Sequence, residues 1–307
     1  MAKSKVGIVG LGIMGGAFAR NIVAAGWRVT GYDIDANRRR AMARAGIEIA
    51  PDAKALSADV KTIITSLPKP AALDATVEAI IQARVSPRIV VEASTFAIDD
   101  KLRAERALRK AGHVMLDCPV SGTGAQAKTK DLVIYASGEP KAIRALRPLF
   151  AAFARAVHDL GAFGNGSRMK YVANLLVAIN NVASAEAMVL GLKAGLDAQT
   201  VFDMVRSGAA NSRVFELRAP MMVRDRYEDA SMKISVWQKD MAVIGEFAHS
   251  LGCPTPMFDA TVRIYDKAMR GGHAAHDTAA VCAVLEKMAG VKRGKKQARM
   301  RSRKRLT

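Results

Sequence analysis

A glycine-rich turn near the start of the chain constrains the fold more than any other feature. Residues 6–9 have the composition of a buried strand, residues 13–25 fit a helix, and Gly-x-Gly-x-x-Gly stands between them. Gly10 permits a tight turn there, Gly12 lets a bound pyrophosphate approach the backbone, and Gly15 lets the helix pack closely on the strand. We therefore predict a dinucleotide cradle formed by Gly10, Leu11, Gly12, Ile13, Met14 and Gly15.

An acidic residue follows the next strand-like run and bears on the choice of dinucleotide. Residues 28–33 end in Asp33, about 20 residues beyond the glycines, where an acid binds the ribose hydroxyls of NAD. A carboxylate repels the 2′-phosphate of NADP. Arg38, Arg39 and Arg40 follow closely and offer a partner for that phosphate. The sequence thus predicts NAD and leaves NADP open.

Apolar strand-like runs alternate with helical stretches in the first half of the chain. The strand-like runs are residues 60–67, 88–93, 113–118, 132–136 and 156–158, and the clearest helical stretches between them are residues 69–84 and 99–112. This βαβ alternation predicts an α/β domain over residues 1–163, with a doubly wound and mostly parallel sheet. Its ligand crevice is expected beyond the carboxyl ends of the strands.

The second half of the sequence predicts helices only. A segment rich in turn formers, residues 161–167, precedes a long helical pattern and marks the domain boundary. The expected helices are residues 167–193, 198–207, 233–250, 256–270 and 277–288. We predict an all-helical domain over residues 164–290, followed by a basic tail over residues 291–307.

Composition excludes several classes of protein. No run approaches the ~20 apolar residues that span a bilayer, and no signal-peptide pattern is evident, so the sequence predicts a cytoplasmic protein without a membrane partner. Cys118, Cys253 and Cys282 are too few and too widely spaced for a disulfide framework, and we expect buried, reduced thiols. His273 and His276 have a spacing that could chelate a metal, but a third ligand is not evident and we predict no metal site.

Net charge is +19, and about half of the excess lies in the tail, which holds nine Lys and Arg and no acid. Such a tail is typical of a disordered extension. It offers a route to nucleic acid through counterion release, without reading sequence. The simpler interpretation is a solvated extension without a function.

Three short segments contain candidate chemistry. Ser121, Gly122 and Thr123 directly follow a strand, and their exposed amides and hydroxyls could bind a carboxylate, although an ordinary turn has the same composition. Lys170 and Asn174 share one face of the long helix at i, i+4 spacing, where a partly desolvated lysine would serve as an acid or base. A solvated surface lysine is the alternative. A third segment, Lys239-Asp240, could be only a surface pair.

Taken in order, these segments resemble the β-hydroxyacid dehydrogenase family, which includes 3-hydroxyisobutyrate dehydrogenase, tartronate semialdehyde reductase and L-threonate dehydrogenase. The motifs that carry the resemblance are Gly10-Leu11-Gly12-Ile13-Met14-Gly15, Ser66-Leu67-Pro68, Ser94-Thr95, Asp117-Cys118-Pro119-Val120-Ser121-Gly122, residues 164–174 and Lys239-Asp240. The resemblance implies a Rossmann domain, a long interdomain helix and a C-terminal domain like that of 6-phosphogluconate dehydrogenase. A homodimer or homotetramer is also expected by resemblance.

The resemblance assigns roles by position. Lys170 matches the catalytic lysine, which handles the proton during hydride transfer between nicotinamide and a short 3-hydroxyacid. The positions that match substrate contacts are Ser121, Gly122, Thr123, Asn174 and Asp240. Those that match cofactor contacts, beyond the glycine turn and Asp33, are Leu67, Pro68, Thr95 and Lys239.

The family pattern still leaves alternatives. The leading substrate is 3-hydroxyisobutyrate-like, with tartronate semialdehyde reduction and L-threonate oxidation as alternatives. Relatives usually carry Ser-Gly-Gly where this chain has Ser121-Gly122-Thr123, and Lys128 and Lys130 add positive charge nearby, so the substrate stays open. A non-catalytic dinucleotide-binding protein tethered to nucleic acid by its tail is the rival from another class. Lys170 argues against that rival and against an imine reductase.

Overall fold

The computed structural model describes residues 4–293, and the chain divides into two compact units. The division falls within the long helix α8 (Asn165–Lys193), between Asn174 and Leu175. Most of the predicted tail, from residue 294 on, lies outside the described residues.

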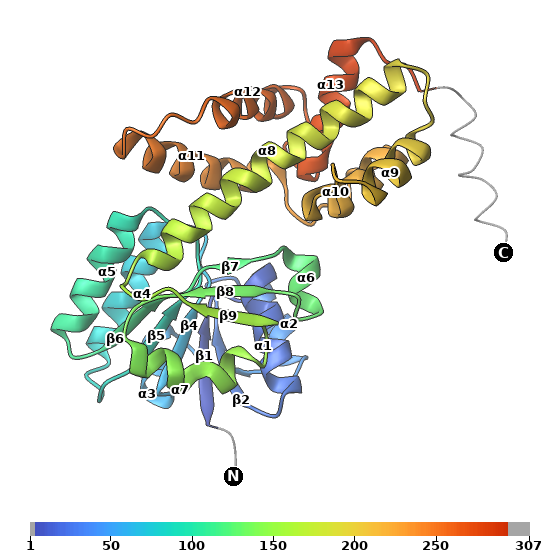
Figure 1. Ribbon diagram of the computed structural model, residues 1–307. Helices are drawn as coiled ribbons and strands as arrows, with labels where there is room; N and C mark the ends of the chain where they lie inside the picture. The colour runs from blue at the N-terminus through green and yellow to red at the C-terminus, as the bar shows by residue number, and fades with distance from the viewer. Residues whose placement is uncertain (1–3, 294–307) are drawn as a thin grey trace. The chain divides into compact units, whose positions relative to one another are not determined.

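The first unit is built on a six-stranded parallel sheet (Figure 1). Its strand order is β3 (Glu48–Ile49), β2 (Arg28–Tyr32), β1 (Lys5–Val9), β4 (Thr62–Thr65), β5 (Ile89–Glu92) and β6 (Val114–Asp117). From β1 the chain first adds β2 and β3 on one side, and then crosses back to add β4, β5 and β6 on the other side of β1. This is the doubly wound arrangement that the βαβ alternation predicts.

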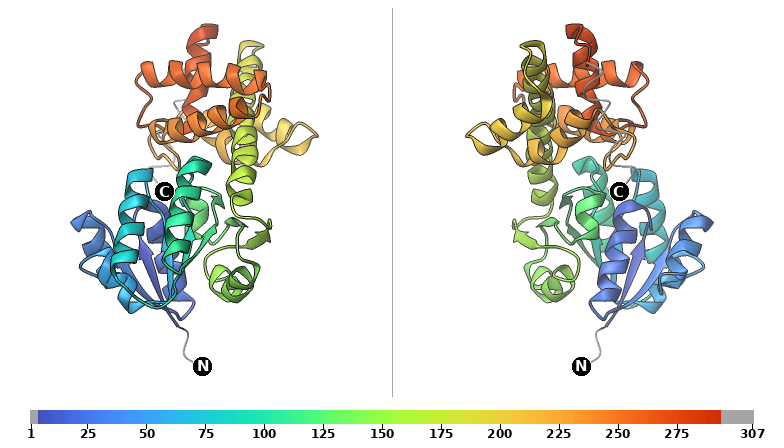
Figure 2. Two further views of the ribbon diagram at one scale, coloured as in Figure 1. Left: turned by 90° about the vertical axis from the view of Figure 1, so that its left-hand side faces the viewer. Right: turned by 90° about the vertical axis from the view of Figure 1, so that its right-hand side faces the viewer.

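Alternate side chains of each strand enter two separate apolar cores. In β4, Ile63 belongs to one core and Ile64 to the other. One core receives side chains of α1 (Ile13–Ala24) and α7 (Pro140–Phe150), and the other those of α3 (Ala53–Asp59), α4 (Pro70–Gln82) and α5 (Ile98–Lys110). The left view of Figure 2 has α4 and α5 toward the viewer and the right view has α1. Because both faces are covered, the strands read as continuous apolar runs.

A second, three-stranded sheet completes the first unit. Its order is β7 (Val120–Ser121), β8 (Val133–Ala136) and β9 (Ala156–Asp159), with β7 antiparallel to β8. The strand-like runs at residues 132–136 and 156–158 thus form strands, but in this small sheet rather than in the large one. An isolated antiparallel bridge between Asp117 and Ser137 links β6 to the end of β8. Helices α2 (Ala36–Ala43) and α6 (Gly124–Lys128) complete the unit.

The second unit is helical throughout its described residues. It contains the remainder of α8, then α9 (Ala198–Ser207), α10 (Arg213–Arg224), α11 (Ile234–Ser250), α12 (Pro256–Arg270), the short 3-10 turn η1 (Thr278–Ala280) and α13 (Val281–Ala289). A buried ion pair of 2.8 Å joins Arg218 of α10 to Asp277, which caps η1. The sequence patterns predict no helix over α10, which has Pro220 in its interior.

Helix α8 corrects the expectation that no segment is long and apolar enough to cross a membrane. It has 29 residues, and its most apolar 18-residue window has a mean hydropathy of 1.6. By length and composition alone, this helix could cross a membrane, but many core helices of folded proteins are equally long and apolar. The helix carries buried polar side chains that a lipid-facing helix avoids, at Ser167, Lys170, Asn174 and Asn181.

Candidate functional site

The glycine turn joins β1 to α1, and each of its three glycines meets a different constraint. Gly10 has φ +92°, and a Cβ there would lie 2.2 Å from the carbonyl oxygen of Ser66. A Cβ on Gly15 would lie 1.9 Å from the carbonyl oxygen of Gly10. At Gly12 the nearest atom is Nη1 of Arg38, at 3.5 Å. The space that a Cβ would enter at Gly12 is therefore open, as the close approach of a pyrophosphate requires.

Asp33 follows β2 and holds the glycine turn in place. Its Oδ2 accepts a hydrogen bond of 2.7 Å from the backbone N–H of Leu11, and its Oδ1 accepts one of 2.9 Å from the backbone N–H of Asp35. Nη1 of Arg38 lies 3.4 Å from Oδ2, and that side chain is 51% exposed. The carboxylate therefore has a cation beside it that water also reaches, and a ligand phosphate could compete for that cation.

Two further segments predicted to contact the cofactor lie at the ends of neighbouring strands. Leu67-Pro68 follows β4, and Thr95 follows β5. The two segments are tied together, because the backbone N–H of Leu67 donates a 2.8 Å hydrogen bond to Oγ of Ser94. Since β1, β4 and β5 are adjacent and parallel, their carboxyl ends meet at one edge of the sheet.

The predicted substrate loop begins at the end of β7. Gly122 has φ +129°, which a side chain would strain. One expectation is wrong here: the backbone N–H of Thr123 is not exposed for a carboxylate, because it donates a 3.0 Å hydrogen bond to Oε1 of Gln126. Nε2 of Gln126 donates in turn to Asp131. The pairing arises because Thr123 is the N-cap of α6 and Gln126 closes a capping box.

Lys170 and Asn174 lie in the first turns of α8, and both side chains are buried. Lys170 is 7% exposed and Asn174 is 4% exposed. The alternative interpretation, a solvated surface lysine, is therefore wrong for Lys170. A lysine is rarely buried unless its charge is paired. Their i, i+4 spacing places both side chains on one helix face.

Close packing brings these segments together in the first unit. A Cβ on Gly124, directly after the substrate loop, would lie 2.3 Å from Cγ2 of Ile13 in the glycine turn. A Cβ on Gly166, four residues before Lys170, would lie 2.7 Å from the carbonyl oxygen of Asp117 and 3.1 Å from Cδ of Pro119. The residue directly after the substrate loop therefore packs on the cofactor turn, and the start of α8 packs on the segment that leads into the same loop.

Lys239 and Asp240 lie in the second unit, on α11. Their side chains form an ion pair of 3.1 Å, in which Asp240 is the more buried partner. Because Asp240 is buried, the pair differs from the surface pair that was the simpler interpretation, and the assigned contacts of both residues with cofactor and substrate stay predictions.

The histidines and cysteines contribute no evident chemistry. Nδ1 of His273 lies 2.9 Å from Nδ1 of His276, and within residues 4–293 no group of three or more His, Cys, Asp and Glu could hold a metal ion. Cys118 and Cys282 are buried, and burial raises the pKa of each thiol, that of Cys282 to about 12. The expectation of burial is wrong for Cys253, which is exposed.

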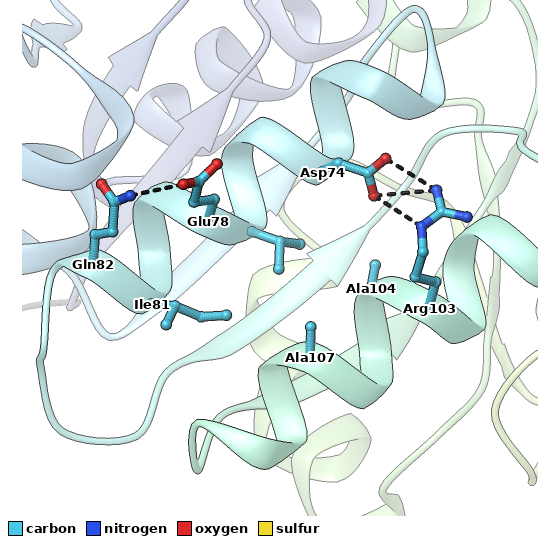
Figure 3. Close-up of a pocket in the computed structure, with 8 residues that line it drawn as sticks. Asp74, Glu78, Ile81, Gln82, Arg103, Ala104 and Ala107 are labelled. Atoms are coloured by element: carbon cyan, nitrogen blue, oxygen red, sulfur yellow. Dashed lines mark hydrogen bonds and ion pairs between the residues drawn. The ribbon is translucent and has the colours of Figure 1, made fainter.

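A hollow of about 450 Å³ lies between α4 and α5 (Figure 3). It is lined by Asp74, Val77, Glu78, Ile81, Gln82, Arg103, Ala104 and Ala107. None of the predicted site residues belongs to it. An ion pair of 3.0 Å between Asp74 and Arg103 borders it, so we regard it as a groove between two surface helices.

Sequence reasoning missed three side chains that hold these segments. Gln126 engages Thr123, Asp117 contacts the start of α8, and Lys101 contacts Asp117. A signal for Lys101 was present, since Lys101, Ala104 and Leu108 recur on the buried face of α5. A charged residue on an apolar helix face needs a buried counterion.

Comparisons with known proteins agree with this geometry. The family described as the NAD binding domain of 6-phosphogluconate dehydrogenase matches residues 5–161, and that described as NAD-binding of NADP-dependent 3-hydroxyisobutyrate dehydrogenase matches residues 164–285. L-threonate dehydrogenase of Escherichia coli strain K12 is 31% identical, over 91% of this chain and 94% of the relative. NAD-dependent L-serine dehydrogenase of Pseudomonas aeruginosa is 28% identical, over 90% and 96%. The crystal structure of 3-hydroxyisobutyrate dehydrogenase from Salmonella typhimurium superposes with a TM-score of 0.83 at 27% identity, covering 92% of this chain and all of that one.

The sheet order and the open glycine turn define an α/β protein of the dinucleotide-binding class. More narrowly, the chain belongs to the β-hydroxyacid dehydrogenase family and is an NAD(P)-dependent hydroxyacid dehydrogenase. The predicted family, fold class, enzyme class and cofactor are thereby confirmed. The roles assigned to individual site residues stay predictions.

Proposed function

We propose that this enzyme interconverts a short 3-hydroxyacid and its carbonyl form, with Lys170 as the general acid and base. The observation that carries the proposal is the packing of three segments in the first unit: Ile13 on Gly124, and Gly166 on Pro119. This packing holds the cofactor turn, the substrate loop and the buried Lys170 in one region of the fold. Reaction and binding groups must be held within a fraction of an ångström for efficient catalysis.

The chemistry divides between the cofactor and the chain. The bound nicotinamide accepts a hydride in oxidation and donates one in reduction. Lys170, as a neutral amine, would take the proton of the substrate hydroxyl in oxidation. In reduction its ammonium would return that proton and stabilise the negative charge that develops on oxygen.

The remaining predicted contacts would orient the substrate. Ser121 and Gly122 are proposed to hold the substrate carboxylate, and the burial of Asn174 beside Lys170 suits a polar contact that orients the hydroxyl. Thr123 would contribute its side chain, because its N–H is engaged by Gln126. A side chain at this position instead of glycine narrows the space for the substrate and makes Thr123 a candidate for selecting among 3-hydroxyacids.

The central test replaces Lys170. We expect Lys170→Ala to lower kcat by about 10²- to 10⁴-fold, the usual contribution of a general acid or base, while NADH binding followed by fluorescence is unchanged. Lys193→Ala is the matched control, because Lys193 lies on the same helix but is exposed and donates a hydrogen bond to the carbonyl oxygen of Ala289. Wild-type turnover in Lys170→Ala would sink the assignment.

The substrate is identified by a panel assay. L-threonate, L-serine and 3-hydroxyisobutyrate appear in the names of the relatives, and glycerate adds a three-carbon acid that has a hydroxyl in place of the amino group of L-serine. Each acid is assayed with NAD and with NADP. We expect measurable kcat/KM for at least one 3-hydroxyacid, with NAD preferred because Asp33 follows β2. Absence of turnover with all of them would contradict the proposed substrate class.

Assembly, location and the tail are part of the same proposal. We propose a homodimer or homotetramer, supported by exposed apolar side chains on the second unit at Leu176, Leu190, Met204 and Met257. Light scattering at several concentrations tests this. A cytoplasmic location also stays a prediction. Nucleic-acid contact through residues 291–307 is tested by deleting them and measuring retention on DNA at low salt.

A further inference from the structure

A buried lysine outside the proposed catalytic groups joins segments of the site. Lys101 of α5 is 1% exposed. Its ammonium lies 2.6 Å from Oε2 of Glu92 and 2.8 Å from Oδ1 of Asp117, and it donates a 2.7 Å hydrogen bond to the carbonyl oxygen of Ser94. The ammonium thus forms hydrogen bonds with Asp117 and with the backbone of Ser94, and an ion pair with Glu92.

The charge of Lys101 is maintained despite its burial. Burial by itself lowers the pKa of Lys101, but the nearby carboxylates of Asp117 and Glu92 raise it above the ordinary value for lysine. The group therefore remains a cation between two acids. Glu92 is further engaged, because its Oε1 accepts a 2.9 Å hydrogen bond from the backbone N–H of Ser94.

Asp117 passes the contact on to α8. Its Oδ2 accepts a 2.7 Å hydrogen bond from the backbone N–H of Ser167, and its Oδ1 accepts one of 2.8 Å from Oγ of the same residue. Oγ of Ser137 donates to Asp117 and accepts a 2.9 Å hydrogen bond from the backbone N–H of Gly166. These bonds satisfy N–H groups in the first turn of α8, and a carboxylate is favoured at that end of a helix.

The positions of these partners along the chain are informative. Ser94 directly precedes Thr95, a predicted cofactor contact, and Asp117 lies four residues before Ser121 of the substrate loop. Ser167 lies three residues, less than one helical turn, before Lys170. A single buried ammonium thus contacts the residue before Thr95 directly and, through Asp117, the strand that leads to the substrate loop and the first turn of α8.

We propose that Lys101 and Asp117 are positioning residues, which hold the first turn of α8 and so fix where the Lys170 amine lies relative to the substrate loop and the cofactor. The inference rests on the proposed role of Lys170. Neither positioning residue touches a reacting atom in this mechanism; they act through the helix start. A displacement of about 1 Å at a catalytic group costs as much as 10²-fold in rate, so a partial loosening should cost about tenfold.

The test is Ser167→Ala, which removes the hydroxyl contact with Asp117 but leaves the Lys101 ion pairs and the backbone bond intact. We expect kcat to fall about tenfold, with KM for the acid and Kd for NADH changed less than twofold. Ser184→Ala is the matched control: Ser184 is also buried on α8 and also loses one hydroxyl hydrogen bond, to the carbonyl oxygen of Asn180. Its kcat should equal that of the wild type, while both variants lose similar thermal stability.

The possible results separate this inference from the proposed function. If Lys170→Ala is inactive and Ser167→Ala retains wild-type kcat, or if Ser184→Ala loses as much activity, positioning is overturned while the function stands. If Lys170→Ala is active, the proposed role of Lys170 fails and the inference fails with it. Should Ser167→Ala not fold, Ser137→Ala is judged by the same criterion, a fall in kcat without a change in KM.

Discussion

Two carboxylates at strand ends of the large sheet, Asp33 beside β2 and Asp117 at the end of β6, can be compared group by group. Each accepts a 2.7 Å hydrogen bond from a backbone N–H at the start of a helix. The donor to Asp33 is Leu11, just before α1, and the donor to Asp117 is Ser167, in the first turn of α8. Each also has a basic side chain beside it. The Arg38 partner of Asp33 is 51% exposed at 3.4 Å, whereas the Lys101 partner of Asp117 is 1% exposed at 2.8 Å.

The difference in burial between Arg38 and Lys101 distinguishes an ion pair whose cation a ligand can take over from an ion pair that only stabilises the fold. Asp33 is itself buried, but its partner Arg38 is half exposed, so water and salt weaken their attraction and the guanidinium can turn to a cofactor phosphate at small cost. In the interior, Lys101 cannot leave, because each departing charge would remain desolvated without a partner. The first carboxylate is thus suited to recognising a ligand, and the second to positioning a helix.

We expect the largest loss of stability from a substitution that breaks the buried ion pair of Lys101 and Asp117. Lys101→Met keeps an unbranched side chain, one atom shorter, but leaves Glu92 and Asp117 buried without a cation, and we expect the free energy of unfolding to fall by about 3–5 kcal/mol. Arg38→Met should cost about 0–1 kcal/mol. Urea unfolding of both variants measures the contrast. Equal losses would show that burial does not distinguish the two pairs.

Within the glycine turn, Gly15 and Gly12 can be compared directly, because one is closely packed and the other borders open space. Gly15→Ala should destabilise the fold by about 1–3 kcal/mol, because its Cβ would lie 1.9 Å from a backbone oxygen that cannot move aside. Gly12→Ala meets nothing closer than 3.5 Å and should fold normally. Its Cβ would instead enter the space of the pyrophosphate. Calorimetry with and without NADH should therefore show a loss of stability only for Gly15→Ala and a loss of affinity for Gly12→Ala.

The exchangeable contact of Arg38 predicts a change in cofactor preference. Arg38→Ala should lower kcat/KM for NADP relative to NAD by about tenfold, which corresponds to about 1.4 kcal/mol. The physical reason is the loss of a cation able to bind the 2′-phosphate. An unchanged NADP-to-NAD ratio would mean that Arg38 stays on Asp33 when cofactor binds.

The smallest expected effect concerns pH and lies at the other end of β6 from Asp117. His113 is buried, its Nδ1 accepts a 3.1 Å hydrogen bond from the backbone N–H of Arg88, and burial, together with the Arg88 charge, lowers the pKa of His113. The folded state therefore binds this proton less readily than the unfolded state. Its stabilising contribution is complete above the unfolded pKa of about 6.5 and declines as pH falls toward the lower folded value.

His113→Asn tests this, since the amide oxygen can replace Nδ1 as acceptor without titrating. Urea unfolding between pH 7 and pH 5 should show a weaker pH dependence in the variant than in the wild type. An identical dependence in both proteins would exclude His113 as a contributor.

The sequence predicted elements where a local pattern is strong. Helices α9 and α12 begin and end at the predicted residues, because capping and proline signals mark their ends. The two-residue strands β3 and β7 have no periodicity to detect, and they exist because neighbouring strands offer hydrogen bonds. Helix α10 was missed because Pro220 breaks the local pattern, while burial of Phe215 and Met222 outweighs that cost.

The candidate site divides in the same way. The glycine turn and Asp33 could be recognised from sequence, because each requires a particular residue type at a fixed spacing on one stretch of chain. The engagement of Thr123 by Gln126 was local but depended on where α6 begins. The contacts of Asp117 with Lys101 and Ser167 cross 16 and 50 residues of chain, and no local pattern encodes them.

By itself, then, the sequence determined the family, the doubly wound sheet, the cofactor class and the candidate residues, since these follow from residue types at short spacings. Only the tertiary structure decided which strands join the second sheet and that Lys170 is buried. It also decided that the cation beside Asp33 is half exposed and that the cation beside Asp117 is buried. The physical reason is that burial and long-range hydrogen bonds depend on how distant elements pack, and packing sets both the local dielectric and the groups that must pair.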